Sequence, residues 1–417
     1  MPHTGRFGIG VVAAAALALA PLAGCSASPG VTTIVLNINK PPALFAQTIS
    51  EFEAQNPDIR VLVDPNDSNF IPSLVRDNPP DLRIAGWASA ETVLAQRGVF
   101  TDLSDTDAAS RMPEASLDLV RQWGGGDGKL DALPFSLLGA GVIYNKDIFA
   151  EQDLSVPKTW DEFVTLCETL KSRGITPVYG TFREPWTTDM PIDYSVGDFS
   201  QTYAQLRTEG PTLTADSPAS FQNTIKDKLD KAKFIFDQTQ ADANSRNYPD
   251  GNVAFANGEA AMYFQGPWAL SELKNANPDV NVGTFPLPLT DDPSATAARI
   301  GLDLVVSIPS GAKHPQEARR FLDFLYQPEV NAKYNDDNAA FSPLEEVAPP
   351  DDPRIAGLVP YIQDQRFYLG MSAYFGAIPK SNYFQEFALN RDAEAMTSAL
   401  TEEWQRQAWR DKMRGIN

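Results

Sequence analysis

The first hundred residues alternate between runs typical of strands and spacings typical of helices. Runs rich in β-branched and aliphatic residues at 31–37, 59–63 and 82–85 predict three strands. Apolar residues within 43–55 and 90–97 recur at helical spacing, which predicts helices between and after these strands. Strand and helix in alternation at such short spacing favour a parallel sheet in an α/β protein.

Later in the chain the pattern predicts fewer strands and more helices. Residues 141–145 predict a strand, and Thr159 followed by Glu162 predicts a helix that begins at a capping box. Helical spacing also covers 317–326 and 393–409. The 33 prolines imply many breaks between short elements, and 417 residues suit two lobes better than one core.

The amino terminus has the pattern of an export signal. Arg6 precedes an apolar run at 9–20 that is too short to span a bilayer comfortably. The run leads into Leu22-Ala23-Gly24-Cys25, which resembles a bacterial lipobox. This resemblance implies that 1–24 is a cleaved lipoprotein signal peptide and that Cys25 carries lipid. Residues 25–30 would then form a lipidated tether at the extracytoplasmic face of the cell membrane. The alternative is an ordinary secretory signal with a chance cysteine.

Charge and residue counts narrow the classes of function. The formal net charge of −20 is spread along the chain, which leaves no basic stripe for nucleic acid. If Cys25 is modified, Cys167 is alone and no internal disulfide can form. Of the two histidines, His3 lies in the leader, so His314 alone is left to act as a base. We therefore expect no metal, no cofactor and no catalytic activity.

Six segments of the chain together resemble the extracellular solute-binding family that includes the maltose and maltodextrin receptors. They occur in the order found in that family and cover nearly all of the chain after the leader. Each of them is a weak signal by itself, and their common order makes the resemblance specific. The segments are 52–61, 79–82, 133–135 with 143–149, 157–163, 255–262 with 266–268, and 308–312 with 317–322.

The resemblance implies an α/β, periplasmic-binding-protein-like fold with two lobes, each discontinuous in sequence and joined by hinge crossovers. The N-terminal lobe is expected to comprise 31–137 and 286–328, and the C-terminal lobe 138–285 and 329–417. A solute would bind between the lobes, at the loop ends of the sheets. The implied partners are a carbohydrate ligand and the permease subunits of an ABC-type importer, and we expect a monomer.

A carbohydrate site needs flat aromatic surfaces for the C–H faces of the sugar and many donors and acceptors for its hydroxyls. Trp268 follows Gly266-Pro267, a break that holds the indole at a loop mouth, and it matches a family tryptophan that stacks on sugar. Trp87 follows the third predicted strand and Gly86, so we expect it to project from the carboxyl edge of the sheet. For both rings the alternative is packing in the core.

Polar candidates lie at two other strand ends. Asn37, Asn39 and Lys40 lie where the first predicted strand meets its loop, although asparagines are also frequent turn formers. Asp303 follows Gly301-Leu302 and is expected either to face the cleft or to form a turn at a strand edge.

Two more segments resemble aromatic sites of the same family. Glu184-Pro185-Trp186 resembles a segment that offers a carboxylate and then a ring to the sugar. Tyr374, followed by Phe375, resembles the C-terminal aromatic pair of the family, and core packing is an equally good interpretation there.

The resemblance is incomplete at two places. The maltodextrin receptors carry acidic residues shortly after the ring that matches Trp87 and near the first crossover. This chain has Ala88-Ser89-Ala90 and Leu137-Leu138 at those places. We therefore expect a mono- or oligosaccharide without specifying maltose.

Two alternative functions stay open from the sequence. One is a receptor of the same fold for a glycerophosphodiester, polyamine or peptide, with Arg183 and Arg366 available for a phosphate. The other is an exported glycoside hydrolase, which needs a pair of carboxylates and has Glu184, Asp189 and Asp193 as candidates.

Overall fold

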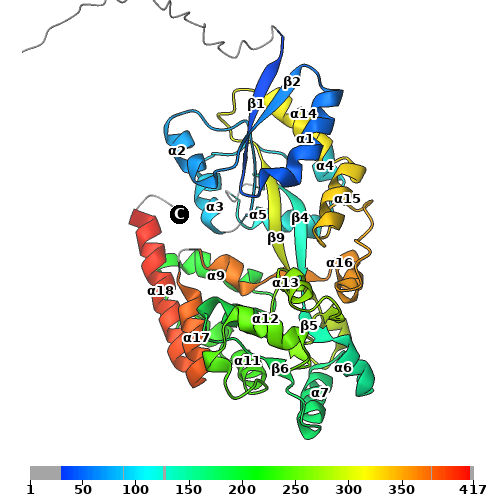
Figure 1. Cartoon of the computed structure of the whole chain (residues 1–417). Coiled ribbons are helices and arrows are strands. Elements are labelled where there is room, and N and C mark those ends of the chain that lie inside the picture. The colour runs from blue at the N-terminus through cyan, green and yellow to red at the C-terminus, as the bar shows by residue number, and fades with distance from the viewer. Residues whose placement is uncertain (1–29, 88, 125–127, 377, 414–417) are drawn as a thin grey trace, which may run out of the picture.

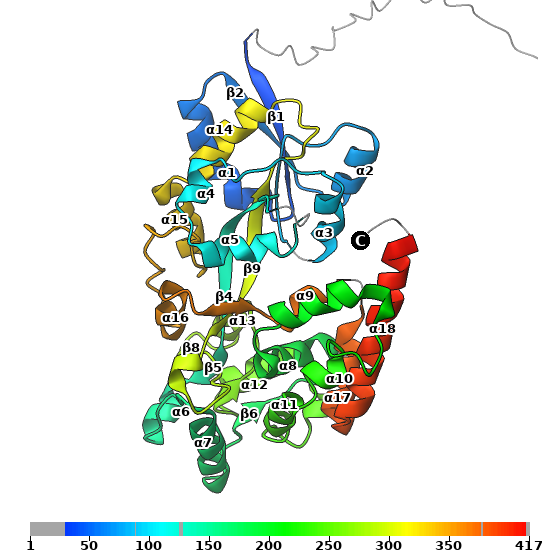
Figure 2. The same cartoon turned by 180° about the vertical axis from the view of Figure 1, so that it is seen from behind.

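The computed structural model describes residues 30–87, 89–124, 128–376 and 378–413, and it contains two sheets in two lobes (Figures 1 and 2). The predicted signal peptide 1–24 and the lipidation residue Cys25 lie outside these residues. In the described residues, no helix is both long enough and apolar enough to cross a membrane.

The first lobe is built on a mixed sheet with the strand order β10-β9-β3-β1-β2, and β4 also pairs with β9. Its first three strands are parallel to one another, as predicted from the sequence. All of β3 is buried, because helices cover both faces of a parallel sheet. The bounds are β1 Thr32–Ile38, β2 Ile59–Asp64, β3 Leu82–Ala85, β4 Leu133–Ala140, β9 Ala298–Ser307 and β10 Phe367–Leu369.

Helices pack on this sheet through single apolar stripes. In α1 (Ala46–Gln55), Phe52 is the fully buried residue, and its ring lies 4.7 Å from that of Phe321 in α14 (Pro315–Leu325). Further helices of the lobe include η1 Pro42–Phe45, η2 Asp67–Asn69, α2 Phe70–Val75, α3 Ser89–Gln96, α4 Asp107–Ser110 and α5 Glu114–Arg121.

The second lobe is built on a smaller sheet with the strand order β6-β7-β5-β8. Its longest early helix is α7 (Trp160–Ser172), which begins at Thr159 as predicted: the Thr159 hydroxyl accepts from the Glu162 amide at 3.1 Å. The Glu162 carboxylate bonds the amide of Lys158, one residue before the cap, instead of the amide of the cap residue. The strands are β5 Val142–Asn145, β6 Val178–Tyr179, β7 Met262–Tyr263 and β8 Val282–Phe285.

Helices make up most of the rest of the second lobe. The last of them, α18 (Ala393–Met413), extends the predicted C-terminal helix and runs along one side of the lobe toward α3 (Figure 1). The others are η3 Pro185–Thr188, α6 Lys146–Glu151, α8 Asp189–Val196, α9 Ser200–Glu209, η4 Gly210–Thr212, α10 Phe221–Thr224, α11 Leu229–Phe236, α12 Tyr248–Ala256, α13 Ala269–Ala276, α16 Val359–Gln363, η8 Met371–Tyr374 and α17 Lys380–Asn390.

Two long strands connect the lobes. β4 and β9 pair antiparallel from Leu133 opposite Val306 to Ala140 opposite Arg299. β4 carries the chain out of the first lobe and β9 carries it back (Figure 1). Short β10 then adds to the second-lobe end of β9, so this end is held between two neighbours.

The helix after α14 belongs by its contacts to the first lobe. Pro328 begins α15 (Pro328–Asp337), because a proline at the first helical position loses no hydrogen bond there. The Tyr334 ring lies 5.2 Å from the rings of both Phe45 and Phe135, and the Asn331 side chain donates to the Phe135 carbonyl. The sequence assigns 329–417 to the second lobe; on these contacts we propose that the last crossing follows α15.

The reactivity of the buried Cys167 thiol can be used to test the packing of the second lobe. It is fully buried in α7, and burial raises the pKa of its thiol to about 12. In a Cys25→Ser chain at pH 8 we expect Ellman's reagent to label Cys167 at least ~100-fold more slowly in the native protein than in urea, since only the thiolate reacts and only an opened core exposes it. Equal labelling rates would show that α7 does not pack as described.

Candidate functional site

The carboxyl ends of parallel strands from both sheets face the region between the lobes. β1 and β3 end toward the second lobe (Figures 1 and 2). In the second lobe, β5 leaves the crossover strand, so antiparallel β7 and its parallel neighbour β6 run back toward the hinge. The Tyr194 hydroxyl confirms this direction, because its oxygen lies 3.1 Å from Gly141 O at the hinge and 3.2 Å from Gln265 O after β7, so one O–H is shared between the two carbonyls. Open α/β sheets bind ligands at such ends.

An exposed aromatic cluster follows β6 and β7. Trp186 and Trp268 are 39% and 42% exposed, and their ring centroids lie 6.3 Å apart. Tyr248, the first residue of α12, lies 4.8 Å from Trp186 in an edge-on arrangement. Large rings are normally buried, so two exposed indoles side by side indicate a surface built to contact something flat and partly apolar.

Glu184 joins this cluster by holding the backbone. Its Oε2 accepts from the Tyr248 amide at 3.0 Å, which fixes the start of α12 beside η3. Tyr248 was not predicted from the sequence. The only local signal is Asn247, whose side chain caps α12, and capping indicates a helix start without showing which rings lie next to it.

Gly266 is the reason that Trp268 lies as it does. A Cβ at residue 266 would lie 2.1 Å from the nearest atom of the Trp268 ring, so the indole folds back over the bare backbone of its own loop. The Gly266-Pro267 pair therefore sets the position of the ring by leaving room for it.

The first lobe carries a polar group just beyond the carboxyl end of β1. The Lys40 ammonium lies 2.7 Å from the Asp303 carboxylate, and the Tyr334 hydroxyl lies 3.4 Å from the other oxygen of Asp303. Asn39 also lies here, because a Cβ on Gly86 would lie 4.0 Å from the Asn39 amide nitrogen and 3.9 Å from the Asp303 carbonyl. Three predicted residues, Asn39, Lys40 and Asp303, are thus brought together.

Three other predicted residues are buried in packing roles in this arrangement. Trp87 is 4% exposed and packs on Phe100 with centroids 5.1 Å apart, instead of projecting from the sheet edge. Asn37 is 1% exposed and donates to the Asn66 carbonyl at 3.2 Å. Tyr374 is 2% exposed, and its hydroxyl donates to Gln122 Oε1 at 2.8 Å. Of these three, only Asn37 holds a loop at the strand ends.

The remaining carboxylates near the cluster are already engaged. Asp193 is fully buried and lies 3.0 Å from the Arg299 guanidinium, and its other oxygen accepts from Ser372. Asp189 pairs with Lys380 at 3.1 Å, and burial raises its pKa. Because Glu184 holds a backbone amide, no described pair among these three carboxylates stands free for acid–base chemistry on a glycosidic bond.

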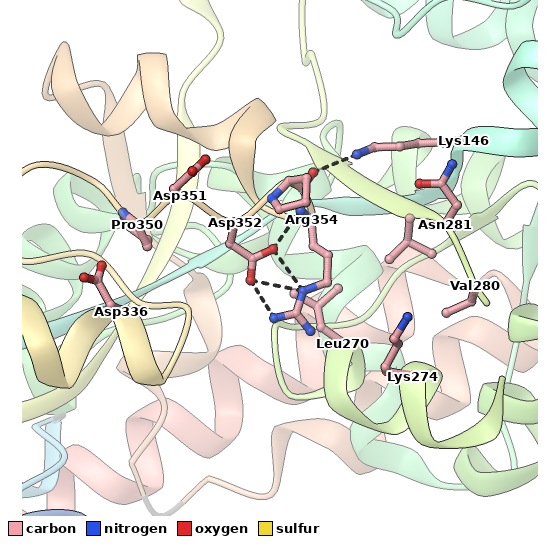
Figure 3. A pocket seen from close by; sticks show the side chains of 12 residues that line it. Lys146, Leu270, Lys274, Val280, Asn281, Asp336, Pro350, Asp351, Asp352 and Arg354 are labelled. Carbon is pink, nitrogen blue, oxygen red and sulfur yellow. Dashed lines mark hydrogen bonds and ion pairs between the residues drawn. The ribbon is translucent and has the colours of Figure 1, made fainter. Parts of the chain in front are cut away.

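Two cavities of about 660 Å³ lie at the edges of the interlobe region. The first lies beside the hinge and is lined by charged residues that bond one another, such as Arg354 with Asp352 and Lys146 with the Pro353 carbonyl (Figure 3). It contains none of the predicted site residues. The second lies between α3 and the second-lobe helices α9 and α18, and Tyr374 is part of its wall.

The family is defined by a match over most of the chain. Residues 47–357 match the model of the bacterial extracellular solute-binding proteins, and the chain belongs to this family. It is a solute-binding protein and not an enzyme. It is 27% identical over 313 residues to the multiple sugar-binding protein of Streptococcus mutans, with 70% of each chain covered.

Solved structures show the same two-lobed fold. The apo-form of RafE from Streptococcus pneumoniae superposes with a TM-score of 0.77 at 24% identity, covering 91% of this chain and 98% of that one. RafE in complex with raffinose superposes with a TM-score of 0.69 at 24% identity, covering 91% of this chain and 100% of that one.

The contact between Gly266 and Trp268 gives a test of the second-lobe site. We expect Gly266→Ala to lower the free energy of unfolding by about 1–3 kcal/mol, because the new methyl displaces the indole. In a Trp268→Ala background the same change should cost less than about 0.5 kcal/mol, since the overlap is gone. Urea denaturation of the four proteins gives both values. Equal costs in the two backgrounds would show that the methyl meets something other than the ring.

Proposed function

We propose that this chain is the solute receptor of an ABC-type importer and that it captures a sugar between its lobes for delivery to a membrane permease. The observation that carries the proposal is the exposed pair Trp186 and Trp268 beside Tyr248, at the ends of β6 and β7. The flat apolar face of an indole matches the C–H face of a pyranose, whereas exposure of the same ring to water is unfavourable.

The polar group on the first lobe supports a hydroxyl-rich ligand. Lys40, Asp303 and Asn39 provide donors and acceptors close together at the strand ends that face the second lobe. A sugar bound across the gap would contact rings on one side and this group on the other. Binding to both lobes at once would favour the closed arrangement through differential affinity. The sugar-binding name of the Streptococcus mutans relative supports the same ligand class.

The alternatives have less support. A phosphate-bearing solute needs a free arginine; Arg366 already bonds Asp364 and the Thr296 carbonyl, which leaves exposed Arg183 as the one candidate of the two. A polyamine needs several unpaired carboxylates near the rings, whereas Asp303, Asp189 and Asp193 each have a cationic partner. A hydrolase needs two free carboxylates flanking the substrate, and the candidates nearest the rings are engaged as described.

The two indoles provide the direct test. We expect raffinose, maltotriose or a constituent monosaccharide to bind saturably in calorimetry, and Trp186→Ala and Trp268→Ala each to weaken the best of these sugars by about tenfold or more. The loss should arise because each variant removes a ring face from the site. Trp409→Ala is the matched control, since Trp409 is 51% exposed on α18, a helix that carries none of the three clustered rings.

The same panel separates the alternatives. If spermidine, glycerophosphocholine or a tripeptide gives binding heat and no sugar does, the protein is a receptor for that solute class instead of a sugar. If the protein releases product from an aryl glycoside and Glu184→Gln abolishes this release, the protein is a hydrolase and not a receptor.

We further propose that the mature chain is held at the extracytoplasmic face of the cell membrane by lipid on Cys25. The support is the run Leu22-Ala23-Gly24-Cys25 after a short apolar segment. Two or three acyl chains anchor a protein stably, where a single chain is marginal. Residues 26–30 would give a short tether before β1.

Replacement of the lipidation residue tests the anchor. The full-length chain expressed in a bacterium should incorporate radiolabelled palmitate and sediment with membranes, and Cys25→Ser should do neither, because the acyl acceptor is the thiol. Cys167→Ser is the control and should behave like the unmodified chain. Palmitate labelling that persists in Cys25→Ser would place the lipid elsewhere, and a chain that is released in both forms would indicate an ordinary secretory signal.

A further inference from the structure

The segment that carries Trp186 is held by one distant helix of the second lobe. Trp186 lies in η3, and α17 packs against η3, α8 and α18 (Figures 1 and 2). Side chains of α17 bond this segment on both sides of the tryptophan, at 182–183 and at 189. Gln385 of α17 follows Phe182 by 203 residues, so only the fold brings the two together.

Before the tryptophan, the side chain of Gln385 bonds two successive carbonyls. Its Nε2 donates to Phe182 O at 2.7 Å and to Arg183 O at 3.2 Å. The amides of the same two residues already donate to Ala243 O and Arg246 O. A backbone carbonyl that leaves water needs a donor, and Gln385 supplies it to both. The stretch that leads into η3 is therefore bonded through its amides to one loop and through its carbonyls to α17.

After the tryptophan, the first turn of α17 bonds Asp189. The Asp189 Oδ2 accepts from Ser381 Oγ at 3.0 Å and lies 3.1 Å from the Lys380 ammonium. The Lys380 and Asp189 side chains are only 20% and 15% exposed, so water screens this pair less than it screens a surface pair. Asp189 directly follows η3, and this contact fixes the end of the turn.

η3 has little internal support for the indole that it carries. It spans four residues, Pro185–Thr188, and its N-cap residue makes no side-chain cap. A turn of this type is short and has poorer hydrogen-bond geometry than an α-helix. The ring of Trp186 is 39% exposed, so packing around the ring does not hold it alone. Its position therefore depends on what holds the two ends of η3.

We propose that Gln385, Ser381 and Lys380 are positioning residues of the solute site, which fix the Trp186 indole without touching the solute. This inference rests on the proposed function for its readout in affinity. A ring binds a sugar face well only when its supports hold it in place, and a loosened support lowers affinity while every contact atom is still present. Loss of the Gln385 donors should therefore weaken sugar binding through Trp186.

The test is a double-mutant cycle in calorimetry with raffinose and maltotriose. The sugar that binds the unmodified chain should bind Gln385→Leu about three- to tenfold more weakly, within the range for residues that act through others. In a Trp186→Ala background the same change should weaken binding by less than about twofold, because no ring is left to position. A residue that only stabilises the lobe would weaken binding equally in both backgrounds.

Matched variants separate the donors of Gln385 from its size. Gln385→Glu keeps the shape but presents acceptors to the two carbonyls, so it should weaken binding as much as Gln385→Leu. Gln385→Lys keeps a donor on a long side chain and should restore most of the affinity. Asn382→Leu is the control, since Asn382 is exposed on the same helix, and it should change nothing. If the Gln385 variants do not fold, Ser381→Ala removes one of the two bonds to Asp189 and should weaken binding by a smaller factor.

Hydrogen exchange measures the same support without any solute. In Gln385→Leu, amides within 182–189 should exchange about fivefold faster or more than in the unmodified chain, because the segment opens locally more often. Asn382→Leu should leave their exchange unchanged. Mass spectrometry of peptides that cover this segment gives both rates.

The outcomes separate this inference from the proposed function. Folded Gln385→Leu and Ser381→Ala proteins with unchanged exchange in 182–189, or with unchanged sugar affinity, would overturn the positioning role. Equal weakening with and without the Trp186 ring would overturn it as well. If no sugar binds the unmodified chain, the proposed ligand class fails, and the solute-free exchange still decides whether α17 holds the segment.

Discussion

The antiparallel pairing of β4 with β9 is the constraint on which the rest of the molecule depends. The two strands pair from Leu133 to Ala140 with irregular register next to Ser136, and β5 of the second sheet begins two residues after β4 ends. This ladder points the carboxyl ends of β1 and β3 at those of β6 and β7.

The candidate site divides its chemistry between the lobes. Flat apolar surface comes from the second lobe, where Trp186, Tyr248 and Trp268 lie at adjacent strand ends. Charge and amide groups come from the first lobe, where Lys40 and Asp303 already neutralise each other. A paired ammonium and carboxylate together carry no net charge, and each can still donate to or accept from a hydroxyl, which suits a neutral, hydroxyl-rich ligand better than an ionic one. The buried pair of Asp193 and Arg299 supports the hinge end of β9 and is not available to a ligand.

The sequence was sufficient where a property is local and insufficient where it depends on packing between distant segments. The strand at 82–85 and the cap at Thr159 were predicted because apolar runs and capping residues act on their own backbone. Trp87 was expected to face a solute, and Tyr374 either to face it or to pack in the core. Both are buried, and their surroundings are set by Phe100 and Trp123, which no neighbouring residue reveals. Tyr248 was missed for the same reason, since only the fold brings the start of α12 beside Trp186. The helix that begins at Pro328 was not predicted from the sequence.

The indole of Trp268 lying over Gly266 limits how this receptor can diverge. The ring of Trp186 is 39% exposed and has room to be exchanged for other side chains, so its mutation can retune the choice of solute. Position 266 has no such freedom, because any side chain there competes with the ring for the same volume. Loss of Gly266 would therefore displace the indole of Trp268 from its present position. Relatives that keep the indole in this position must keep both Gly266 and Trp268.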